Sequence, residues 1–159
     1  MRNYIMLFAL FFVVQTIQAQ DSTNAQTAVS DEELEKYAVT MDSVEDMKAS
    51  LLEDITEMVK ANDKITNARY NDLSKIVDDD AALKEAKATP EEIAFIKEVA
   101  AKKEEGTKKI QETFQSMAKE YVGASSYNKI KDALKTNPEL KKRYETQLDK
   151  LGGDDSDVN

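Results

Sequence analysis

Between residues 34 and 65, apolar side chains recur three and four positions apart, which is the spacing of one face of an α-helix. They form two adjacent rows with a spacing of seven, and the rows contain Leu34, Met41, Lys48 and Ile55, and Tyr37, Val44, Leu51, Met58 and Ile65. Just before them, Ser30-Asp31-Glu32-Glu33 has the pattern of a capping box, in which Ser30 and Glu33 each bond the other's backbone N–H. The pattern predicts a long helix from residue 31 and leaves open whether Asn62-Asp63 breaks it.

A second long helix is predicted from Thr89 to about Val122. Thr89-Pro90-Glu91-Glu92 supplies an N-cap, a proline at a position that needs no N–H, and a second capping box. The two apolar rows of this helix, again spaced by seven, contain Ile93, Ala100, Thr107, Phe114 and Tyr121, and Ile96, Lys103, Ile110 and Met117. Gly106 lies in the middle of the helix, where it costs roughly 1 kcal/mol relative to alanine. Gly123 is placed to end the helix.

The remaining segments predict shorter elements. Residues 64–87 are less regular, and they contain an acidic run at 78–80 that we interpret as a solvated turn or helix cap. An EF-hand would need oxygen ligands at alternating positions and a glycine at the sixth, and this run has neither. Toward the C-terminus, Ser125 or Ser126 is predicted to cap a short helix, and Asn137-Pro138 to begin another. The expected buried faces of these helices contain Tyr127, Ile130, Ala133 and Leu134, and Leu140, Tyr144, Leu148 and Leu151.

These elements predict an all-α fold, a helical bundle built on two long antiparallel amphipathic helices with shorter C-terminal helices. Both long helices lose apolar character near their middles, at Lys48 in the first and at Lys103 and Thr107 in the second. In an antiparallel pair these positions meet in one layer. That layer is either a small polar binding site or a solvated level, at which the lysines extend into water and Gly106 relieves crowding. We favour the solvated level.

Composition removes several classes of chemistry. The 159 residues include no histidine and no cysteine, which excludes Cys–His and Ser–His–Asp catalysis and ordinary zinc sites. Carboxylate pairs, Ser/Lys or tyrosine chemistry and calcium-type oxygen sites remain. No spacing selects one of them, so no catalytic, cofactor-binding or metal-binding residue is assigned and no cofactor is expected. A net charge of −9 argues against binding to nucleic acid.

The first residues have the order of a secretory signal peptide. Arg2 precedes an unbroken apolar run at residues 5–14, and Ala19 supplies a small residue at the expected cut. A membrane anchor is the alternative, but the run is well short of the roughly 20 residues that cross a bilayer. We therefore predict a signal peptide at 1–19, a flexible leader at 20–29, a helical domain at 30–151 and an acidic flexible tail at 152–159. The cut before Gln20 is typical of a periplasmic or secreted protein of a Gram-negative-type bacterium.

Two segments resemble a known family. The first, Ser30-Asp31-Glu32-Glu33-Leu34-Glu35-Lys36-Tyr37-Ala38, opens the domain, and the second closes it as Ser126-Tyr127-Asn128-Lys129-Ile130 followed by Asn137-Pro138-Glu139-Leu140. The pair is similar to the motifs of the exported bacterial family catalogued as domain of unknown function 4168. The resemblance covers roughly residues 29–151, although residues 62–88 show none of the family's pattern. It implies a helical protein located in the cell envelope, and it transfers no catalytic residue.

Together these features favour an exported protein that is not an enzyme but a non-catalytic cell-envelope interaction or stress-related protein. Its expected partners are proteins of the envelope, and the strong seven-residue repeats also allow a homo-oligomer. Nucleic acid and a stable membrane span after cleavage are not expected. The alternatives are a small-ligand or calcium-binding protein, with the tail at 152–159 as a weak calcium candidate, and a carboxylate-based hydrolase.

Overall fold

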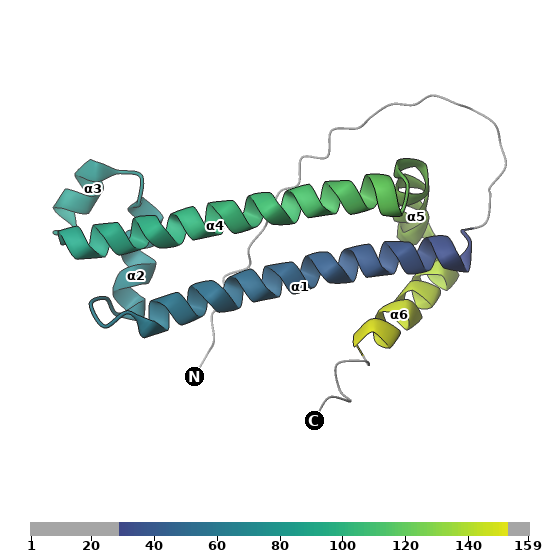
Figure 1. Cartoon of the computed structure of the whole chain (residues 1–159), viewed down its shortest axis with the longest axis horizontal. Coiled ribbons are helices and arrows are strands. Elements are labelled where there is room, and N and C mark those ends of the chain that lie inside the picture. Colours follow the sequence, from purple (N-terminus) through teal and green to yellow (C-terminus); the bar gives the residue numbers. More distant parts are fainter. Residues whose placement is uncertain (1–28, 153–159) are drawn as a thin grey trace.

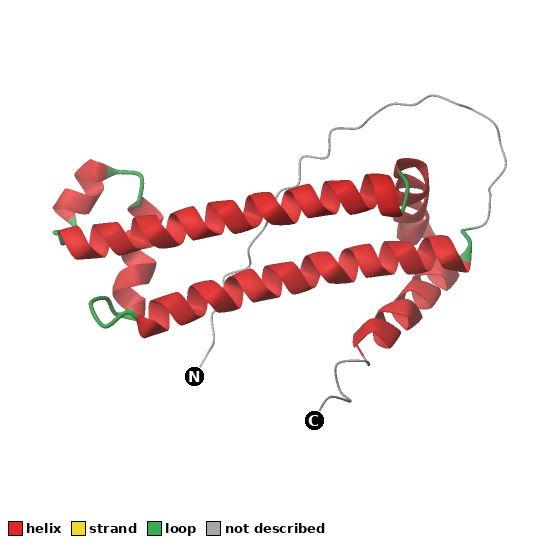
Figure 2. Cartoon of the chain, in the orientation of Figure 1, coloured by secondary structure: helices red, strands yellow, loops and turns green. Residues whose placement is uncertain are grey.

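The computed structural model describes residues 29–152, and every regular element in that range is a helix (Figures 1 and 2). In chain order the elements are α1 (Asp31–Ala61), α2 (Asn67–Leu73), the 3-10 turn η1 (Ser74–Ile76), α3 (Asp80–Glu85), α4 (Pro90–Ser116), the π-helical segment η2 (Met117–Tyr121), α5 (Ala124–Thr136) and α6 (Pro138–Gly152). The prediction of an all-α helical bundle is confirmed. The predicted signal peptide (1–19), residues 20–28 of the leader and residues 153–159 of the tail lie outside the described residues.

The two long helices, α1 and α4, lie side by side and run in opposite directions (Figure 1). Near one end of the pair, the Nζ of Lys36 lies 6.0 Å from the ring centre of Tyr121. Further along, Lys102 forms an ion pair with Asp54 at 2.9 Å, so residue numbers rise on α1 as they fall on α4. The short helices sit at the two ends of this hairpin: α5 and α6 where α1 begins, α2 and α3 where it stops.

Both long helices begin with the capping boxes that the sequence predicts. At the start of α1, Glu33 N–H donates to the Ser30 hydroxyl at 3.1 Å and Ser30 N–H donates to the Glu33 carboxylate at 3.0 Å. At the start of α4, Glu92 N–H donates to the Thr89 hydroxyl at 3.2 Å and Thr89 N–H to the Glu92 carboxylate at 2.9 Å. Each box satisfies backbone donors that the first turn of a helix leaves free, and so fixes where the helix starts.

Asn62-Asp63 breaks the first helix. Asn62 has an extended backbone (φ −82°, ψ 117°), and its side-chain oxygen accepts the N–H of Lys64 at 2.9 Å. This local bond offers the backbone an alternative to the next helical turn. Ile65, which the seven-residue pattern places on α1, is therefore buried against α2, α3 and α4 after the break.

The apolar core is divided into two clusters at opposite ends of the hairpin. The first cluster joins the start of α1 to α5 and α6, and its buried residues are Val29, Leu34, Tyr37, Val122, Ile130 and Leu140. The second joins the start of α4 to α2 and α3, and its buried residues are Ile65, Leu73, Leu83 and Ile96. Between the clusters, α1 has no buried residue at 45–58 and α4 has none at 100–109. The middle of the hairpin is therefore a two-helix section without a closed core.

The end of α4 differs from the sequence prediction in one detail. The helical path continues to Tyr121, as predicted, but its last turn is π-helical, with Val122 N–H donating to the carbonyl of Met117 at 2.9 Å. Gly123 follows with φ 88°, a conformation that glycine adopts without strain. The chain then enters α5 at once, so the predicted cap by Ser125 or Ser126 is wrong. Both serines lie inside the first turn, and no side chain caps α5.

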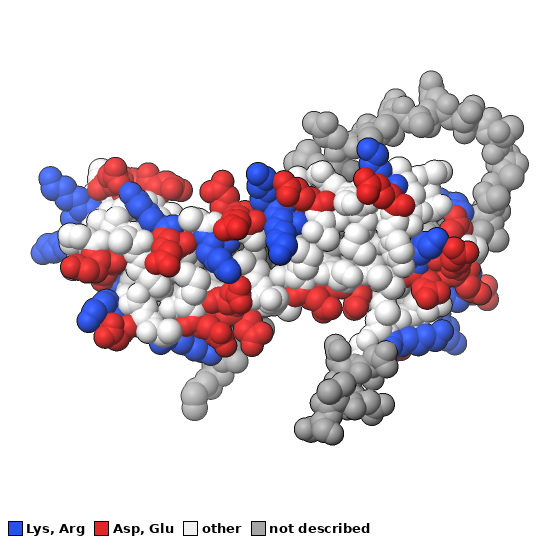
Figure 3. All heavy atoms as spheres, viewed as in Figure 1, with Lys and Arg blue, Asp and Glu red and all other residues white. Residues whose placement is uncertain are grey.

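The acidic run at 78–80 is a helix cap, as predicted. The Asp79 carboxylate accepts the N–H groups of Ala81 and Ala82 at 3.0 and 2.9 Å, and so begins α3. No helix within residues 29–152 combines the length and apolar character that crossing a membrane requires. Acidic and basic side chains are interspersed over the face of the molecule drawn in Figure 3.

Candidate functional site: a groove between α1 and α4

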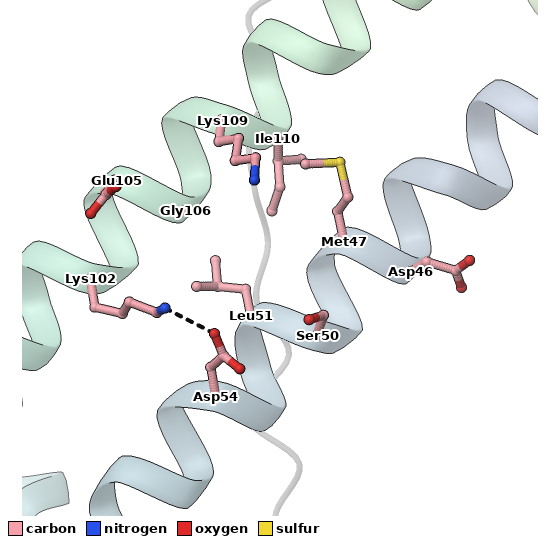
Figure 4. Close-up of a pocket in the computed structure, with 10 residues that line it drawn as sticks. All are labelled: Asp46, Met47, Ser50, Leu51, Asp54, Lys102, Glu105, Gly106, Lys109 and Ile110. Carbon is pink, nitrogen blue, oxygen red and sulfur yellow. Dashed lines mark ion pairs between the residues drawn. The ribbon is translucent and has the colours of Figure 1, made fainter.

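A groove lies along the middle of the hairpin, in the section without a closed core (Figure 4). Its volume is about 410 Å³. The residues that line it are Asp46, Met47, Ser50, Leu51 and Asp54 of α1 and Lys102, Glu105, Gly106, Lys109 and Ile110 of α4. Figure 4 shows Leu51 pointing across the gap toward α4, and Met47 reaching toward Ile110. The groove thus has an apolar centre and a charged rim.

Gly106 allows the Leu51 side chain of α1 to pack directly against the backbone of α4. A Cβ atom at this position would lie 2.5 Å from Cδ1 and 2.8 Å from Cδ2 of Leu51, closer than carbon atoms pack. Without that Cβ, the Leu51 side chain fills the space that a longer residue on α4 would occupy. The interpretation that Gly106 relieves crowding is confirmed, and its cost to the helix is offset by this contact.

One ion pair crosses the groove. Asp54 and Lys102 lie 2.9 Å apart, with 49% and 43% of their side chains exposed, and the nearby carboxylate raises the pKa of Lys102 through this hydrogen bond. An ion pair so exposed to water contributes little to stability. Asp46 and Lys109 also line the groove, and neither has an ion-pair partner among residues 29–152. The charged groups of Asp46 and Lys109 are therefore available to a molecule that binds in the groove.

The predicted layer of Lys48, Lys103 and Thr107 does not form the groove. Lys48 is half-exposed and reaches Glu45 on its own helix at 3.3 Å, whereas Lys103 is exposed to water. Thr107 is half-buried but does not line the groove. These positions agree with the interpretation of a solvated level. The groove lies beside that level, and its lining residues are within two helical turns of Lys48, Lys103 or Thr107.

Sequence reasoning did not find the charged residues of the rim. They fall outside the apolar rows, on positions that the sequence presents as ordinary solvated surface. The feature of the sequence that could have indicated the groove is Gly106, because a glycine inside a long helix often marks close packing. Antiparallel pairing then places Gly106 opposite Leu51, and the neighbouring turns supply Asp54 and Lys102.

A second cluster of polar groups lies where α1 meets α5. The Glu33 carboxylate accepts from the Ser126 hydroxyl at 2.7 Å and from the Lys129 Nζ at 2.8 and 2.9 Å. Together with the capping bond from Ser30 N–H, these donors lower the pKa of Glu33 from its usual 4.5 to about 2, with Lys129 as the largest cause. This Ser/Lys pair is held by a carboxylate. Lys129 is the charged partner of Glu33, and Ser126 donates its proton to Glu33, so the geometry is that of a structural clamp.

Three tyrosines pack beside this clamp. The ring of Tyr37 lies 5.2 Å from that of Tyr127 and 5.6 Å from that of Tyr144, centre to centre. Burial is the main cause that raises the pKa of all three phenols, so they stay protonated at neutral pH. A raised pKa keeps each phenol from acting as a phenolate base, and the cluster acts as core packing for the end of the hairpin.

The described part of the chain contains no group of three or more acidic residues that could hold a metal ion. No family model, curated protein or solved structure matches the chain. The resemblance to the family of domain of unknown function 4168 therefore stays a prediction. The two segments that carry it do meet in the fold, because Glu33 of the first binds Ser126 and Lys129 of the second.

Proposed function

We propose that this chain is a non-catalytic interaction protein of the bacterial cell envelope, in which the groove between α1 and α4 receives an amphipathic helix of a protein partner. The observation that carries the proposal is the open middle of the hairpin, where neither long helix has a buried residue at 45–58 or 100–109. Helical domains commonly bind partners by accepting the apolar face of a helix in such a groove.

The side chains around the groove support a helix rather than a small molecule as the occupant. The groove is open to solvent, and its centre consists of Met47, Leu51 and Ile110. A helix laid along the groove would cover this apolar surface and place its own polar groups against the charged rim.

We propose that the functional protein keeps the two long antiparallel helices as a hairpin, and that packing at both ends of the hairpin stabilises it. The clusters around Ile130 and Ile96 fasten the short helices to the hairpin and leave its middle free. Packing at the ends thus supplies the stability that the middle lacks. A binding groove can then stay open without unfolding the chain.

Location in the envelope rests on the sequence alone, from Arg2 and the apolar run at residues 5–14. Mass spectrometry of the protein isolated after export tests it directly. We expect a chain that begins at Gln20. A chain that retains its first 19 residues would contradict both the cleavage and this part of the proposal.

Site-specific photo-crosslinking in the native host tests the groove. A photo-reactive amino acid replaces Ser50, which lines the groove, or Gln111, which is exposed on α4 outside it. We expect Ser50 to give one or two discrete crosslinked proteins and Gln111 to give only diffuse background. Equal patterns from both positions, or no product from Ser50, would overturn the proposal.

A further inference from the structure

We propose that, in the free protein, the groove is occupied by the same groove of a second copy of this chain, so that two hairpins pack face to face as a symmetric four-helix section. The inference rests on the proposed function because it concerns the same groove, and it names what fills that groove before an envelope partner binds. Cyclic dimers of this kind use one self-complementary patch on each copy. The groove provides such a patch, with an apolar centre on both helices and charges of both signs on the rim.

The incomplete core gives the physical reason for pairing. Helices enclose an apolar core on all sides only when at least three of them surround it, and four do so in a four-helix bundle. Each end of this hairpin satisfies that condition, through α5 and α6 at one end and α2 and α3 at the other. The middle does not, since α1 and α4 are the only elements of residues 29–152 present there. A second hairpin supplies the two missing helices at that level.

The distribution of charge selects a second copy as the partner. Over residues 45–60, α1 has five acidic residues and two lysines, whereas α4 has five lysines and four glutamates over residues 97–112. A two-fold axis that runs along the helices places α1 of one copy over α4 of the other. The α1 stretch, with a net charge of 2 − 5 = −3, then faces the α4 stretch, with a net charge of 5 − 4 = +1, twice in each dimer. The other face-to-face arrangement sets α1 on α1 and repels.

The antiparallel pairing within one hairpin also sets the level of these contacts. The Leu51–Gly106 and Asp54–Lys102 contacts show which residues of α1 and α4 share a level. Asp46 and Lys109 lie within about one turn of the same level on the two sides of the groove. Because the axis runs along the helices, Asp46 of α1 in one copy lies at the level of Lys109 of α4 in the other. Neither residue forms an ion pair within residues 29–152, so both charges are available to the second copy.

The size of the surface predicts a weak dimer. Sixteen residues of helix are about 24 Å long, and two adjacent helices are about 20 Å wide, so each copy presents a footprint of roughly 500 Å². Two such footprints bury about 1,000 Å² in total, which is the lower limit for a specific interface. Association in the micromolar range is therefore expected, and an envelope partner that binds more tightly displaces the second copy from the groove.

Analytical ultracentrifugation of the full exported protein tests the dimer at concentrations from about 1 to about 300 μM, which bracket a micromolar constant. We expect a monomer–dimer equilibrium in the wild type. Asp46→Lys and Lys109→Glu should each weaken association by roughly tenfold or more, because each places like charges opposite one another twice in the dimer. The control is Lys108→Glu, an equal change of charge next to Lys109 at an exposed position that does not line the groove, and it should weaken association much less than Lys109→Glu.

Mixing the two groove variants gives the sharpest result. In a mixed dimer, the new lysine of the Asp46→Lys chain faces the new glutamate of the Lys109→Glu chain. The unchanged Lys109 of the first chain faces the unchanged Asp46 of the second. An equimolar mixture should therefore recover association that neither variant shows alone. Recovery supports the pairing of α1 with α4. A mixture that does not recover association overturns the proposal. A wild type that stays monomeric at all concentrations also overturns it, and so does a dimer that persists in both the Asp46→Lys and the Lys109→Glu variant.

The experiments distinguish failure of the proposed dimer from failure of the proposed function. A monomeric protein that still captures an envelope protein through Ser50 overturns the dimer and keeps the interaction role. A dimer that captures no other protein keeps the second copy as occupant and overturns the envelope partner. Circular dichroism of each variant at the same concentrations confirms that loss of association is not loss of helix.

Discussion

Glu33 of α1 and Lys129 of α5, 96 residues apart, form an ion pair in which both carboxylate oxygens accept from one Nζ, at 2.8 and 2.9 Å. The same carboxylate completes the capping box of α1 with Ser30 and accepts from the Ser126 hydroxyl. One side chain therefore both starts the first long helix and fixes the C-terminal helices against it. Its donors are the backbone of Ser30 and two side chains of α5, so its removal should weaken the whole end of the hairpin.

Replacing Glu33 by glutamine should lower the free energy of unfolding at pH 7 by about 1–2 kcal/mol, because charge-assisted hydrogen bonds and a helix cap are lost together. Urea denaturation followed by circular dichroism measures the change. The control is Glu35→Gln, an exposed residue in the same turn, which should stay within about 0.5 kcal/mol of the wild type. Equal effects from the two variants would show that the contacts of Glu33 contribute nothing.

The same carboxyl predicts a pH dependence with a definite sign. Its donors, Lys129 first, lower the pKa of Glu33 from 4.5 to about 2 in the folded protein. The folded state therefore binds the proton less tightly than the unfolded chain, and the contribution of Glu33 is fully present above pH 4.5. It is lost as the pH falls from 4.5 toward 2. The difference in unfolding free energy between the wild type and Glu33→Gln should shrink over that window, and a difference that stays constant down to about pH 2.5 would contradict it.

Gly106 and Leu51 should show strong energetic coupling. Alanine favours a helix interior over glycine by about 1 kcal/mol, so Gly106→Ala would stabilise α4 if space allowed. In the folded protein the new Cβ meets Leu51 at 2.5 and 2.8 Å, and the leucine must move. We expect Gly106→Ala alone to give no stabilisation, and Gly106→Ala in a Leu51→Ala background to give about 1 kcal/mol.

A double-mutant cycle measured by urea denaturation gives that coupling. The four proteins are the wild type, the two single variants and the double variant. Contacting residues typically show coupling energies above about 0.5 kcal/mol, whereas independent sites add within that amount. Additive effects of Gly106→Ala and Leu51→Ala would mean that the glycine does not serve the approach of the two helices.

The two lysines that interrupt the apolar rows should be replaceable. Lys48→Leu and Lys103→Leu should preserve or raise the midpoint of thermal unfolding, because the first side chain is half-exposed and the second is exposed. The pair between Lys48 and Glu45 lies on the surface of one helix and contributes little. Thermal unfolding followed by circular dichroism measures the midpoints. A loss of several degrees in either variant would instead indicate a specific polar role in this layer.

The local signals in the sequence predict most of the fold. Capping boxes at Ser30 and Thr89 are read from four residues each, and both are present in the structure. The serine cap predicted for α5 failed because it depended on how sharply the chain turns at Gly123. A left-handed glycine lets the next helix begin at once, and the sequence does not reveal how many residues the turn consumes.

The groove could be predicted only in part because it depends on the register between two helices. The apolar rows predict that α1 needs a partner, and Gly106 indicates close packing. Neither tells which turn of α1 faces the glycine, and a shift of one turn would bring other charges to the rim. The break at Asn62 adds a second variable, since the register also depends on the whole connection at residues 62–89, which contains α2, η1 and α3. Tertiary packing determines both the register of the two helices and the path of the chain after Asn62.

The other end of the hairpin depends on a different pair. Arg69 of α2 binds Glu92 of α4 through Nε at 2.9 Å and Nη2 at 3.1 Å, and Nη2 also donates to the carbonyl of Ala86 at 3.0 Å. The planar fork of arginine makes these three bonds together, and lysine cannot. Arg69→Lys should therefore loosen the second cluster. Since that cluster is separate from the first, the effect should stay local.

Native-state hydrogen exchange resolves this locality. In Arg69→Lys, the amides of Leu73 and Leu83 should exchange faster, whereas those of Ile130 and Leu140 should keep their wild-type rates. The matched variant is Arg143→Lys, since the arginine of α6 donates to the carbonyl of Val29 and to Asp31 at the opposite end. It should give the reverse pattern, with faster exchange in the first cluster only. Equal acceleration at both ends by either variant would mean that the open middle couples the two clusters into one cooperative unit.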